Sequence, residues 1–307
     1  MQIWTDISRH AERAEIFHGA ALTMGNFDGL HLGHQTLVKT AARLPGPTVV
    51  ITFDPHPVQV LYPERRLRRL FPRADLAEQL PQYGVDLLVI LRFTRDFSQL
   101  SSQQFLRAYL EAPFRPRHLV AGYDFAFGQS RSGTLASLRE WSTSHGATLH
   151  QVPPVELGGE IVSSGRIRKL VENGDVPEAS TLLGRPFYLR GPVGTGAGRG
   201  TKLGFPTLNQ NVENEVLPAL GVYATRVRWK GTALPAVTNV GVNPTFGGES
   251  RVKVETHVLS GSIEARGEQI DVDFIERLRP ELRFPGIEDL KKQIGADILK
   301  AKRIHGM

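Results

Sequence analysis

The stretch LTMGNFDGLHLGHQTLV, residues 22–38, joins a short apolar run to a glycine-rich turn and then to a helical pattern. A strand, a tight turn and a helix in this order are typical of a βαβ unit. His31 and His34 stand where the helix is expected to begin, with Gly33 between them. A helix N-terminus offers unpaired N–H groups and a positive dipole end, which attract phosphate. The stretch therefore predicts a phosphate site at the end of a core strand.

Strand-like and helix-like segments alternate on both sides of this stretch, over about residues 20–152. The strand-like runs are ALTM, TVVITF, DLLVIL, HLVAG and TLHQV. Such alternation is typical of a doubly wound parallel sheet, whose ligands bind beyond the carboxyl ends of the strands. A helical stretch at 163–183 follows, and Gly184 and Pro186 interrupt it. We expect a first domain of residues 1–183.

The second half has a different pattern, in which alternating strands are separated by glycine and proline. Its strand-like runs are FYLRGPVG, GVYATRVRW, LPAVTNVGV, RVKVETHVL and QIDVDFIERL. Antiparallel strands of this kind protect their edges by closing into a barrel. The segment from Ile287 to Ile304 is expected to be a helix with one apolar face. The predicted fold class is α/β plus mainly β: a doubly wound parallel sheet, then an antiparallel β-barrel with a C-terminal helix at residues 184–307.

Composition excludes several classes of protein. The 307 residues contain no cysteine, so disulfides, thiolate metal sites and a cysteine nucleophile are excluded. The net charge of +6 comes mostly from the second half, with 18 Lys+Arg against 13 Asp+Glu there and 19 against 18 in residues 1–183. No apolar run approaches the length of a membrane helix, and the N-terminus does not resemble a secretory signal. We expect a cytoplasmic protein without membrane or nucleic-acid partners; the sequence leaves weak self-association open.

The two histidines have a chemical interpretation and a chance interpretation. Histidines three residues apart often occur by chance, but His31 and His34 follow the first strand of a predicted nucleotide-binding sheet. Two imidazoles there can donate hydrogen bonds to a phosphorus centre whose negative charge spreads during displacement. Ser163, Ser164 and Arg168 stand at another expected helix start, where hydroxyl and guanidinium groups suit the departing phosphates. Together the two elements favour nucleotidyl transfer.

A second set of polar residues follows a glycine-rich loop, GPVGTGAGRGTKLGFPTLN, residues 191–209. The loop lacks the order of a P-loop, so its glycines indicate either a phosphate cradle or ordinary turns. Thr207 and Asn209 are two residues apart, hence on one side of an extended segment, and carry oxygen ligands suited to Mg²⁺. Glu255 is a candidate base for an alcohol, but periodicity does not decide whether its face meets solvent or substrate.

With these motifs the chain resembles the HxGH nucleotidylyltransferases and, more closely, the bifunctional bacterial riboflavin kinase/FAD synthetases. The first half carries the resemblance in four segments: GNFDGLHLGH (25–34), TFDPHP (52–57), GYDFAFGQSRSG (122–133) and SSGRIR (163–168). The second half carries it in the glycine loop and in GFPTLN (204–209), GVYATRV (221–227), NVGVNPTFGG (239–248), VETHVL (254–259) and LRPELRF (278–284). The resemblance implies two ATP-using activities in one chain.

For the first half, the resemblance implies that the phosphate of FMN attacks the α-phosphorus of ATP. His31 and His34 would stabilise the transition state. The residues implied in binding ATP are Gly25, Asn26, Phe27, Ser163, Ser164 and Arg168. Those implied near the flavin are Asp124, Phe125 and His56.

For the second half, the resemblance implies transfer of the γ-phosphoryl group of ATP to riboflavin. Thr207 and Asn209 would bind Mg²⁺, Glu255 would activate the 5′-hydroxyl, and Arg279 would lie near the flavin. The residues implied in binding ATP are Gly196, Gly198, Arg199, Lys202, Gly204 and Pro206. The expected partners are therefore riboflavin, FMN, FAD and ATP, with ATP as co-substrate and Mg²⁺ as cofactor.

Two alternatives stay open at this point. One is that a single half has lost its activity, through Gly165 in the serine motif or through the segment 259–267. The other is a flavin- or RNA-binding regulator that uses the barrel and a basic surface. Trp229 between Arg228 and Lys230 is the kind of aromatic and basic pairing that this regulator requires.

Overall fold

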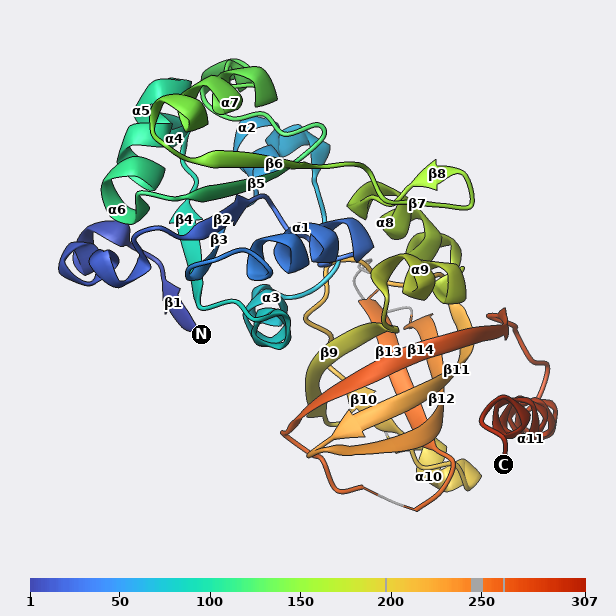
Figure 1. Cartoon of the computed structure of the whole chain (residues 1–307). Helices are drawn as coiled ribbons and strands as arrows, with labels where there is room; N and C mark the ends of the chain where they lie inside the picture. Colours follow the sequence, from blue (N-terminus) through green and yellow to red (C-terminus); the bar gives the residue numbers. More distant parts are fainter. Residues whose placement is uncertain (197, 244–250, 262) are drawn as a thin grey trace. The chain divides into compact units, whose positions relative to one another are not determined.

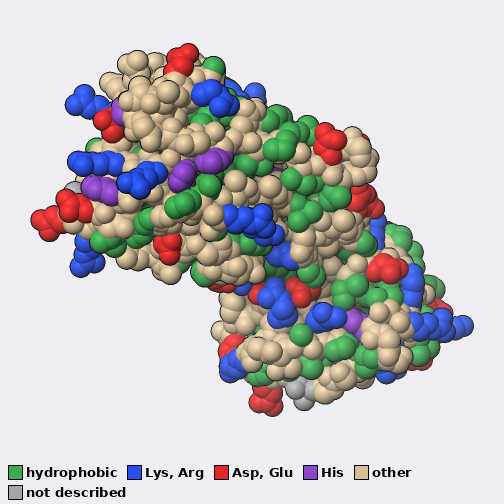
Figure 2. Space-filling model, in the orientation of Figure 1, with side chains coloured by type: hydrophobic (Ala, Val, Ile, Leu, Met, Phe, Trp, Pro, Cys, Tyr) green, Lys and Arg blue, Asp and Glu red, His purple; other side chains and the backbone are tan. Residues whose placement is uncertain are grey.

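The computed structural model describes residues 1–196, 198–243, 251–261 and 263–307 (Figure 1). The chain divides into two compact units. Unit 1 consists of Met1–Arg68 and Arg73–Val162, and unit 2 of Arg69–Pro72 and Ser163–Met307. On the face shown in Figure 2, basic and acidic side chains are interspersed.

Unit 1 contains a six-stranded sheet in which every neighbouring pair is parallel. The strands are β1 (Gln2–Trp4), β2 (Ala21–Met24), β3 (Thr48–Asp54), β4 (Leu87–Arg92), β5 (His118–Gly122) and β6 (Thr148–Val152). Their order is β1-β4-β3-β2-β5-β6, which confirms the predicted doubly wound sheet. The edge strand β1 is an addition to the prediction.

Helices cover both faces of this sheet (Figure 1), because alternate strand residues enter separate cores. Leu22, Ile51 and Val89 lie in one core with Leu138, whereas Val50 and Leu88 lie in another with Val38. The α-helices of unit 1 are α1 (Leu32–Ala42), α2 (Pro57–Leu61), α3 (Arg73–Gln79), α4 (Arg95–Ser98), α5 (Ser102–Leu106), α6 (Ala112–Phe114) and α7 (Leu135–Ser144). Segments of 3₁₀-helix lie at Ile7–Phe17, Pro63–Arg65, Leu80–Tyr83 and Gln129–Arg131, and a π-helical turn lies at Arg107–Glu111. The short strand β7 (Glu156–Leu157) pairs with β8 (Glu160–Ile161).

Unit 2 contains a closed six-stranded antiparallel barrel, as predicted. The strands are β9 (Phe187–Gly194), β10 (Leu208–Gln210), β11 (Gly221–Trp229), β12 (Thr232–Asn243), β13 (Arg251–Val258) and β14 (Gln269–Pro280). Inside the wall, the hydroxyl of fully buried Thr238 lies 2.8 Å from that of Thr225 and 2.9 Å from that of Thr256. The short strand β10 closes the barrel between β9 and β13.

Among the described residues, the α-helices that accompany the barrel are α8 (Ser164–Asn173), α9 (Val176–Leu183), α10 (Arg199–Leu203) and α11 (Ile287–Ile304). The expected C-terminal helix is therefore confirmed. It packs on β11 and β14 through Ala301 and Ile304, which contact Val222 and Ala224. Acidic residues lie in the first turn of this helix and basic residues in its last turn. These charges stabilise the helix through their interaction with the helix dipole.

The helical stretch 163–183 belongs to unit 2 by its contacts. Gly174 divides it into α8 and α9, because its φ of 89° lies in the left-handed region that other residues avoid. The Arg277 guanidinium of β14 donates hydrogen bonds to the carbonyl oxygens of Asn173 and Leu220, at 3.3 and 2.7 Å. The bond to Asn173 attaches the end of α8 to the barrel, and α9 packs against β14 and β9. A functional boundary at residue 183 remains a prediction.

A second part of unit 2 comes from within the first half of the sequence, the segment 69–72. The chain leaves unit 1 after Arg68, contributes these four residues to unit 2, and returns at Arg73. Leu70 is fully buried, and the ring of Phe71 lies 5.5 Å from Phe187 and 4.7 Å from Tyr188, both on β9. The segment therefore forms part of the packing of the barrel.

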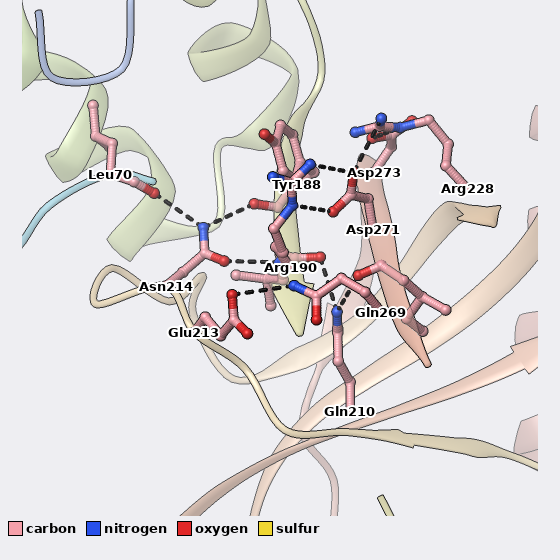
Figure 3. A network of polar contacts seen from close by, with 12 residues as sticks. Leu70, Tyr188, Arg190, Gln210, Glu213, Asn214, Arg228, Gln269, Asp271 and Asp273 are labelled. Atoms are coloured by element: carbon pink, nitrogen blue, oxygen red, sulfur yellow. Dashed lines mark hydrogen bonds and ion pairs between the residues drawn. The ribbon is translucent and has the colours of Figure 1, made fainter. Parts of the chain in front are cut away.

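The side chain of Asn214 connects this segment to β9 (Figure 3). Its amide nitrogen donates to the carbonyl oxygens of Leu70 and Tyr188, both at 3.0 Å, and its oxygen accepts from the backbone N–H of Arg190 at 2.8 Å. Because the asparagine is buried, these bonds satisfy polar groups that would otherwise lose water without compensation.

Ion pairs extend the same network across β9, β14 and β11 (Figure 3). Arg190 binds Asp271 at 2.7 Å, and Arg228 binds Asp271 at 3.2 Å and Asp273 at 2.9 Å. Burial raises the pKa of Asp273, and the Arg228 guanidinium opposes this shift. The Arg228 guanidinium also lies 4.8 Å from the ring centre of Tyr188. The aromatic and ionic contacts thus form one continuous cluster.

We expect Phe71→Ala to destabilise the barrel by about 3 kcal/mol, because it removes a buried ring and leaves a cavity against β9. Hydrogen exchange of β9 and β14 amides measures the change where it occurs. Leu61→Ala is the control, since that side chain is 40% exposed and should change stability by no more than about 0.5 kcal/mol. If hydrogen exchange of the β9 and β14 amides is unchanged in Phe71→Ala, the segment 69–72 contacts the barrel without stabilising it.

Candidate active sites

The strand order of unit 1 brings three predicted site loops to one edge of the sheet. β2 lies between β3 and β5, so the chain connections diverge there and form a topological switch point. The loops that follow these three strands carry Asn26 and Phe27, His56, and Asp124 and Phe125. The sheet therefore gathers residues that are 30 to 100 positions apart in sequence into one crevice-forming edge.

The turn after β2 has an unusual backbone that buried side chains hold in place. Phe27, Gly29 and Leu30 have φ angles of 48°, 82° and 40°, all in the left-handed region. Phe27 and Leu30 are 2% and 1% exposed and pack with Val38 of α1. The hydroxyl of Thr52 on β3 donates to the carbonyl oxygen of Asn26 at 3.2 Å. Packing thus stabilises a conformation that the residues alone would disfavour.

His31 and His34 lie together at the start of α1, as the sequence predicts. Their rings stack with centroids 3.7 Å apart, and the Nδ1 atom of His31 caps the helix by accepting from the backbone N–H of His34 at 3.4 Å. In a neutral His31 this bond places the ring proton on Nε2. A Cβ at Gly33 would lie only 3.2 Å from the His31 ring. Glycine at this position therefore avoids a steric conflict with that ring.

The environment of His34 keeps its imidazole neutral. Burial lowers the pKa of His34 well below its usual range, and the neighbouring His31 lowers it further. The edge of Phe27 covers one side of the ring, with centroids 5.3 Å apart. Among the described residues, the buried Nδ1 atom of His34 has no hydrogen-bond partner. The His34 imidazole can therefore act by hydrogen bonding without carrying a positive charge.

We expect the stability of unit 1 to decrease on acidification because of this pKa shift. The folded pKa of His34 lies below the unfolded value of 6.5, so the unfolded state binds more protons as pH falls through that value. The free energy of unfolding should fall below about pH 6.5. Urea unfolding at pH 7.5, 6.5 and 5.5 measures the slope, and His34→Gln should reduce it. Equal slopes in the two proteins would contradict the shift.

The predicted flavin residues of unit 1 differ in their environment. His56 is buried and caps α2, where its Nδ1 accepts from the backbone N–H of Val58 at 3.1 Å. Asp124 is exposed, and its carbonyl oxygen accepts from Arg131 at 3.3 Å. Phe125 is half-buried and stacks on Phe127, with centroids 5.5 Å apart. Their role in flavin binding remains a prediction.

Ser163, Ser164 and Arg168 begin α8, which belongs to unit 2. The Ser163 hydroxyl caps this helix by accepting from the backbone N–H of Arg166 at 3.2 Å. The preceding carbonyl, that of Val162 in unit 1, lies 3.8 Å from the position that a Cβ on Gly33 would take. Contact of Ser163, Ser164 and Arg168 with departing phosphates remains a prediction.

In unit 2, several glycines of the loop after β9 are required by close approaches. A Cβ at Gly196 would lie 2.2 Å from the Asn209 amide, and one at Gly200 would lie 2.4 Å from the Phe205 carbonyl oxygen. Gly198 and Gly204 have φ angles of 67° and 91°, in the left-handed region. The loop therefore lies against the Thr207–Asn209 segment. Residue 197 and the side chains of Arg199 and Lys202 lie outside the described residues.

Asn209 and Glu255 are direct cross-strand partners on β10 and β13. The neighbouring Val254 and Thr256 are buried in the barrel, so Glu255 lies on the outer face, where it is half-buried. Thr207 is also half-buried, and the Pro206 carbonyl oxygen accepts from Nδ1 of His257 at 2.8 Å. The structure thus brings the predicted metal ligands and the predicted base to one region of the wall.

Arg279 contributes to packing as well as to the predicted site. Its guanidinium forms a bidentate ion pair with Asp297 of α11, at 2.8 to 3.0 Å, and both side chains are largely buried. It also lies 5.7 Å from the ring centre of Phe284. The sequence did not identify Asp297 as its partner, because the two residues are 18 positions apart on different elements. A role of Arg279 at the flavin remains a prediction.

Comparison with known proteins matches two families to successive parts of the chain. Residues 13–166 match the family described as FAD synthetase, and residues 183–305 match riboflavin kinase. None of the described helices is long and apolar enough to cross a membrane.

Named relatives match over nearly the whole chain. A bifunctional riboflavin kinase/FMN adenylyltransferase of Listeria monocytogenes is 35% identical over 300 residues, covering 96% of this chain and 91% of the relative. The Escherichia coli K12 protein of the same name is 33% identical and covers 94% of each chain. A solved structure from Streptococcus pneumoniae, named a macrolide-efflux protein, is 32% identical with a TM-score of 0.83 and covers 91% of this chain and 92% of its own. The chain therefore belongs to the bifunctional riboflavin kinase/FMN adenylyltransferase family, the FAD synthetases.

Proposed function

We propose that the two activities of this family use separate sites, one around the histidine pair of unit 1 and one around Glu255 on the barrel. Riboflavin and ATP give FMN and ADP at the barrel, and FMN and a second ATP give FAD and pyrophosphate at the histidines. The stacked histidine pair at the start of α1, with His34 held neutral by burial, is the observation that supports this division most strongly.

At the first site, a phosphate oxygen of FMN attacks the α-phosphorus of ATP. The new phosphorus–oxygen bond forms as the bond to the β-phosphate oxygen breaks, and pyrophosphate leaves. His31 and His34 donate hydrogen bonds to the oxygens on which negative charge increases. The attacking oxygen carries no proton at neutral pH, so this step needs no base. Gly25, Asn26 and Phe27 would lie along ATP, with Ser163, Ser164 and Arg168 at the leaving phosphates and His56, Asp124 and Phe125 at the flavin.

At the second site, Glu255 accepts the proton of the terminal ribityl hydroxyl as its oxygen attacks the γ-phosphorus of ATP, and ADP leaves. The loop 196–206 would cover the phosphates with backbone N–H groups, since its glycines leave room for a close approach. Arg279 would contact the flavin from the edge of the barrel.

Thr207 and Asn209 fit the requirements of Mg²⁺. Both carry hard oxygen donors, both are half-buried on the same wall, and Asn209 is the cross-strand partner of Glu255. Bound there, the ion would neutralise charge on the β- and γ-phosphates.

The test supplies purified protein with riboflavin, ATP and Mg²⁺ and follows flavins by chromatography. FMN should appear first and FAD after it, with ADP and pyrophosphate as co-products. Formation of neither flavin nucleotide would contradict the proposal. Supplying FMN directly identifies the loss of a single activity, for example through Gly165 or the segment 259–267, of which residue 262 lies outside the described residues.

The regulator hypothesis has less support. Trp229 donates to Glu268 at 2.7 Å and Lys230 binds the same carboxylate at 2.8 Å, so this pair already forms intramolecular contacts. Basic side chains in view in Figure 2 are also interspersed with acidic ones. Salt-dependent binding of RNA to the full chain would revive this hypothesis. A cytoplasmic location, the lack of nucleic-acid and membrane partners, and weak self-association remain predictions.

A further inference from the structure

Three polar residues form a row across the outer face of the barrel at the kinase site. Glu255 on β13 is the direct partner of Asn209 on β10 and of Asn239 on β12. Paired residues on antiparallel strands point to the same face, with Cβ atoms about 4.5 to 5.5 Å apart. Thr238 and Thr256, the neighbours of Asn239 and Glu255, are fully buried inside the wall. The row is therefore half-buried and faces outward, with the carboxylate between two amides.

A second carboxylate lies at the Asn239 end of the row. Gly241 is two residues beyond Asn239 on the same face of β12. A Cβ there would lie 2.6 Å from the Oε1 atom of Glu281 and 3.1 Å from the Nδ2 atom of Asn239. The Glu281 carboxylate and the Asn239 amide thus flank the same space, which the missing side chain of Gly241 leaves open. A negative charge next to the NH₂ group favours the orientation that keeps the amide carbonyl available on the opposite side.

These groups are not used by the fold. Within the described parts of the chain, no hydrogen bond or ion pair involves the side chain of Asn239, Glu255 or Glu281. Glu281 is exposed, but Asn239 and Glu255 are half-buried. Half-buried polar groups without protein partners are costly unless water or a ligand satisfies them. Elsewhere in unit 2 the comparable amide of Asn214 makes three such bonds, and that of Gln210 makes two.

The two sides of Glu255 suit different substrates. The Asn209 side lies against the glycine loop and carries the proposed Mg²⁺ ligands, so it suits the phosphates of ATP. The alcohol must then reach Glu255 from the other side, which Asn239 occupies. A polyol offers several adjacent hydroxyls, each a donor and an acceptor, and a primary amide matches both functions.

We propose that Asn239 is a substrate-positioning residue of the kinase, whose amide binds hydroxyls of the ribityl chain beside Glu255, with Glu281 orienting that amide. This assignment rests on the proposed role of Glu255 as base. It predicts that Asn239 acts on the alcohol substrate and not on ATP. Fixing the hydroxyl next to the base lowers the cost of reaching the reactive geometry.

The experiment compares steady-state kinetics of Asn239→Ala, Asn239→Asp, Glu281→Gln and Glu255→Gln in the full chain. Asn239→Ala should raise the KM for riboflavin about tenfold and leave the KM for ATP within about twofold. Asn239→Asp keeps the shape but loses the NH₂ group and adds charge beside two carboxylates, so its loss should be at least as large. Glu281→Gln should raise the riboflavin KM by a few-fold, and Glu276→Gln, at an exposed glutamate on β14, should not.

The outcomes distinguish a failure of the role proposed for Asn239 from a failure of the role proposed for Glu255 as base. A normal riboflavin KM in both Asn239 variants would overturn the role of Asn239, as would a parallel rise in the KM for ATP. Full kinase activity in Glu255→Gln would reject the base, yet a selective rise in the riboflavin KM of Asn239→Ala would still support alcohol binding. Unchanged thermal unfolding and unchanged FAD formation from FMN confirm that each variant is folded.

Discussion

Replacement of His31 by alanine should reduce FAD formation from FMN by about 100-fold or more, while FMN formation from riboflavin stays within about twofold. The loss follows from the geometry of the pair: Nδ1 of His31 is used in capping α1, so Nε2 carries the proton that stabilises the displaced phosphate oxygens. Removing one such donor from a transition state typically costs about 10² to 10³ in rate. Separate assays with FMN and with riboflavin measure the two activities in one preparation.

His31→Asn separates catalysis from helix capping. Asparagine is a favourable N-cap residue, so it retains the cap of α1 but lacks the imidazole. We expect it to lose FAD formation nearly as severely as the alanine variant, with thermal unfolding close to the wild type. Wild-type activity in His31→Asn would mean that the ring serves only to begin the helix. Equal loss of both activities would refute separate sites.

Replacement of Glu255 by glutamine should reduce FMN formation by about 10² to 10⁴, the range typical of a lost general base. Glutamine has nearly the same size and can still hydrogen-bond, but it cannot accept the hydroxyl proton at neutral pH. Because Glu255 lies on the outer face of the wall and is half-buried, the substitution should leave the barrel intact. The KM values for riboflavin and ATP should change little, since the residue acts on the reacting proton.

FAD formation from supplied FMN is the internal control for the Glu255 variant. It should continue at the wild-type rate, because the histidine pair lies in unit 1 and Glu255 in unit 2. A kinase rate that remains within a few-fold of wild type would show that the hydroxyl loses its proton without this carboxylate. In that case the proposed metal ligands on the Asn209 side of Glu255 would have to account for the whole acceleration of phosphoryl transfer.

Most of the regular elements could be predicted from the sequence because their local patterns are long and consistent. The range 187–194 for β9, 221–229 for β11 and 287–304 for α11 agrees with the predicted runs. β1 and β10 were not predicted, since three residues do not establish a period of two. Long-range pairing gives these segments their strand structure, β1 with β4 and β10 with β9 and β13.

The sequence alone determined the two fold classes, the order of the two halves and the position of His31 and His34 at the start of a helix. These depend on local periodicity, on glycine positions and on the physics of a helix N-terminus, all of which act within about one turn or one strand. The histidine pair is accordingly found where the sequence placed it.

Only the tertiary structure decided the features that depend on contacts between distant elements. Periodicity showed that Glu255 and Thr256 point to opposite faces, but only barrel closure showed which face is interior. In the same way, Arg279 acquires Asp297 as a partner and the 69–72 segment joins the barrel. The physical reason is that burial and pairing are properties of the packed chain, and residues far apart in sequence carry no local signal of their contact.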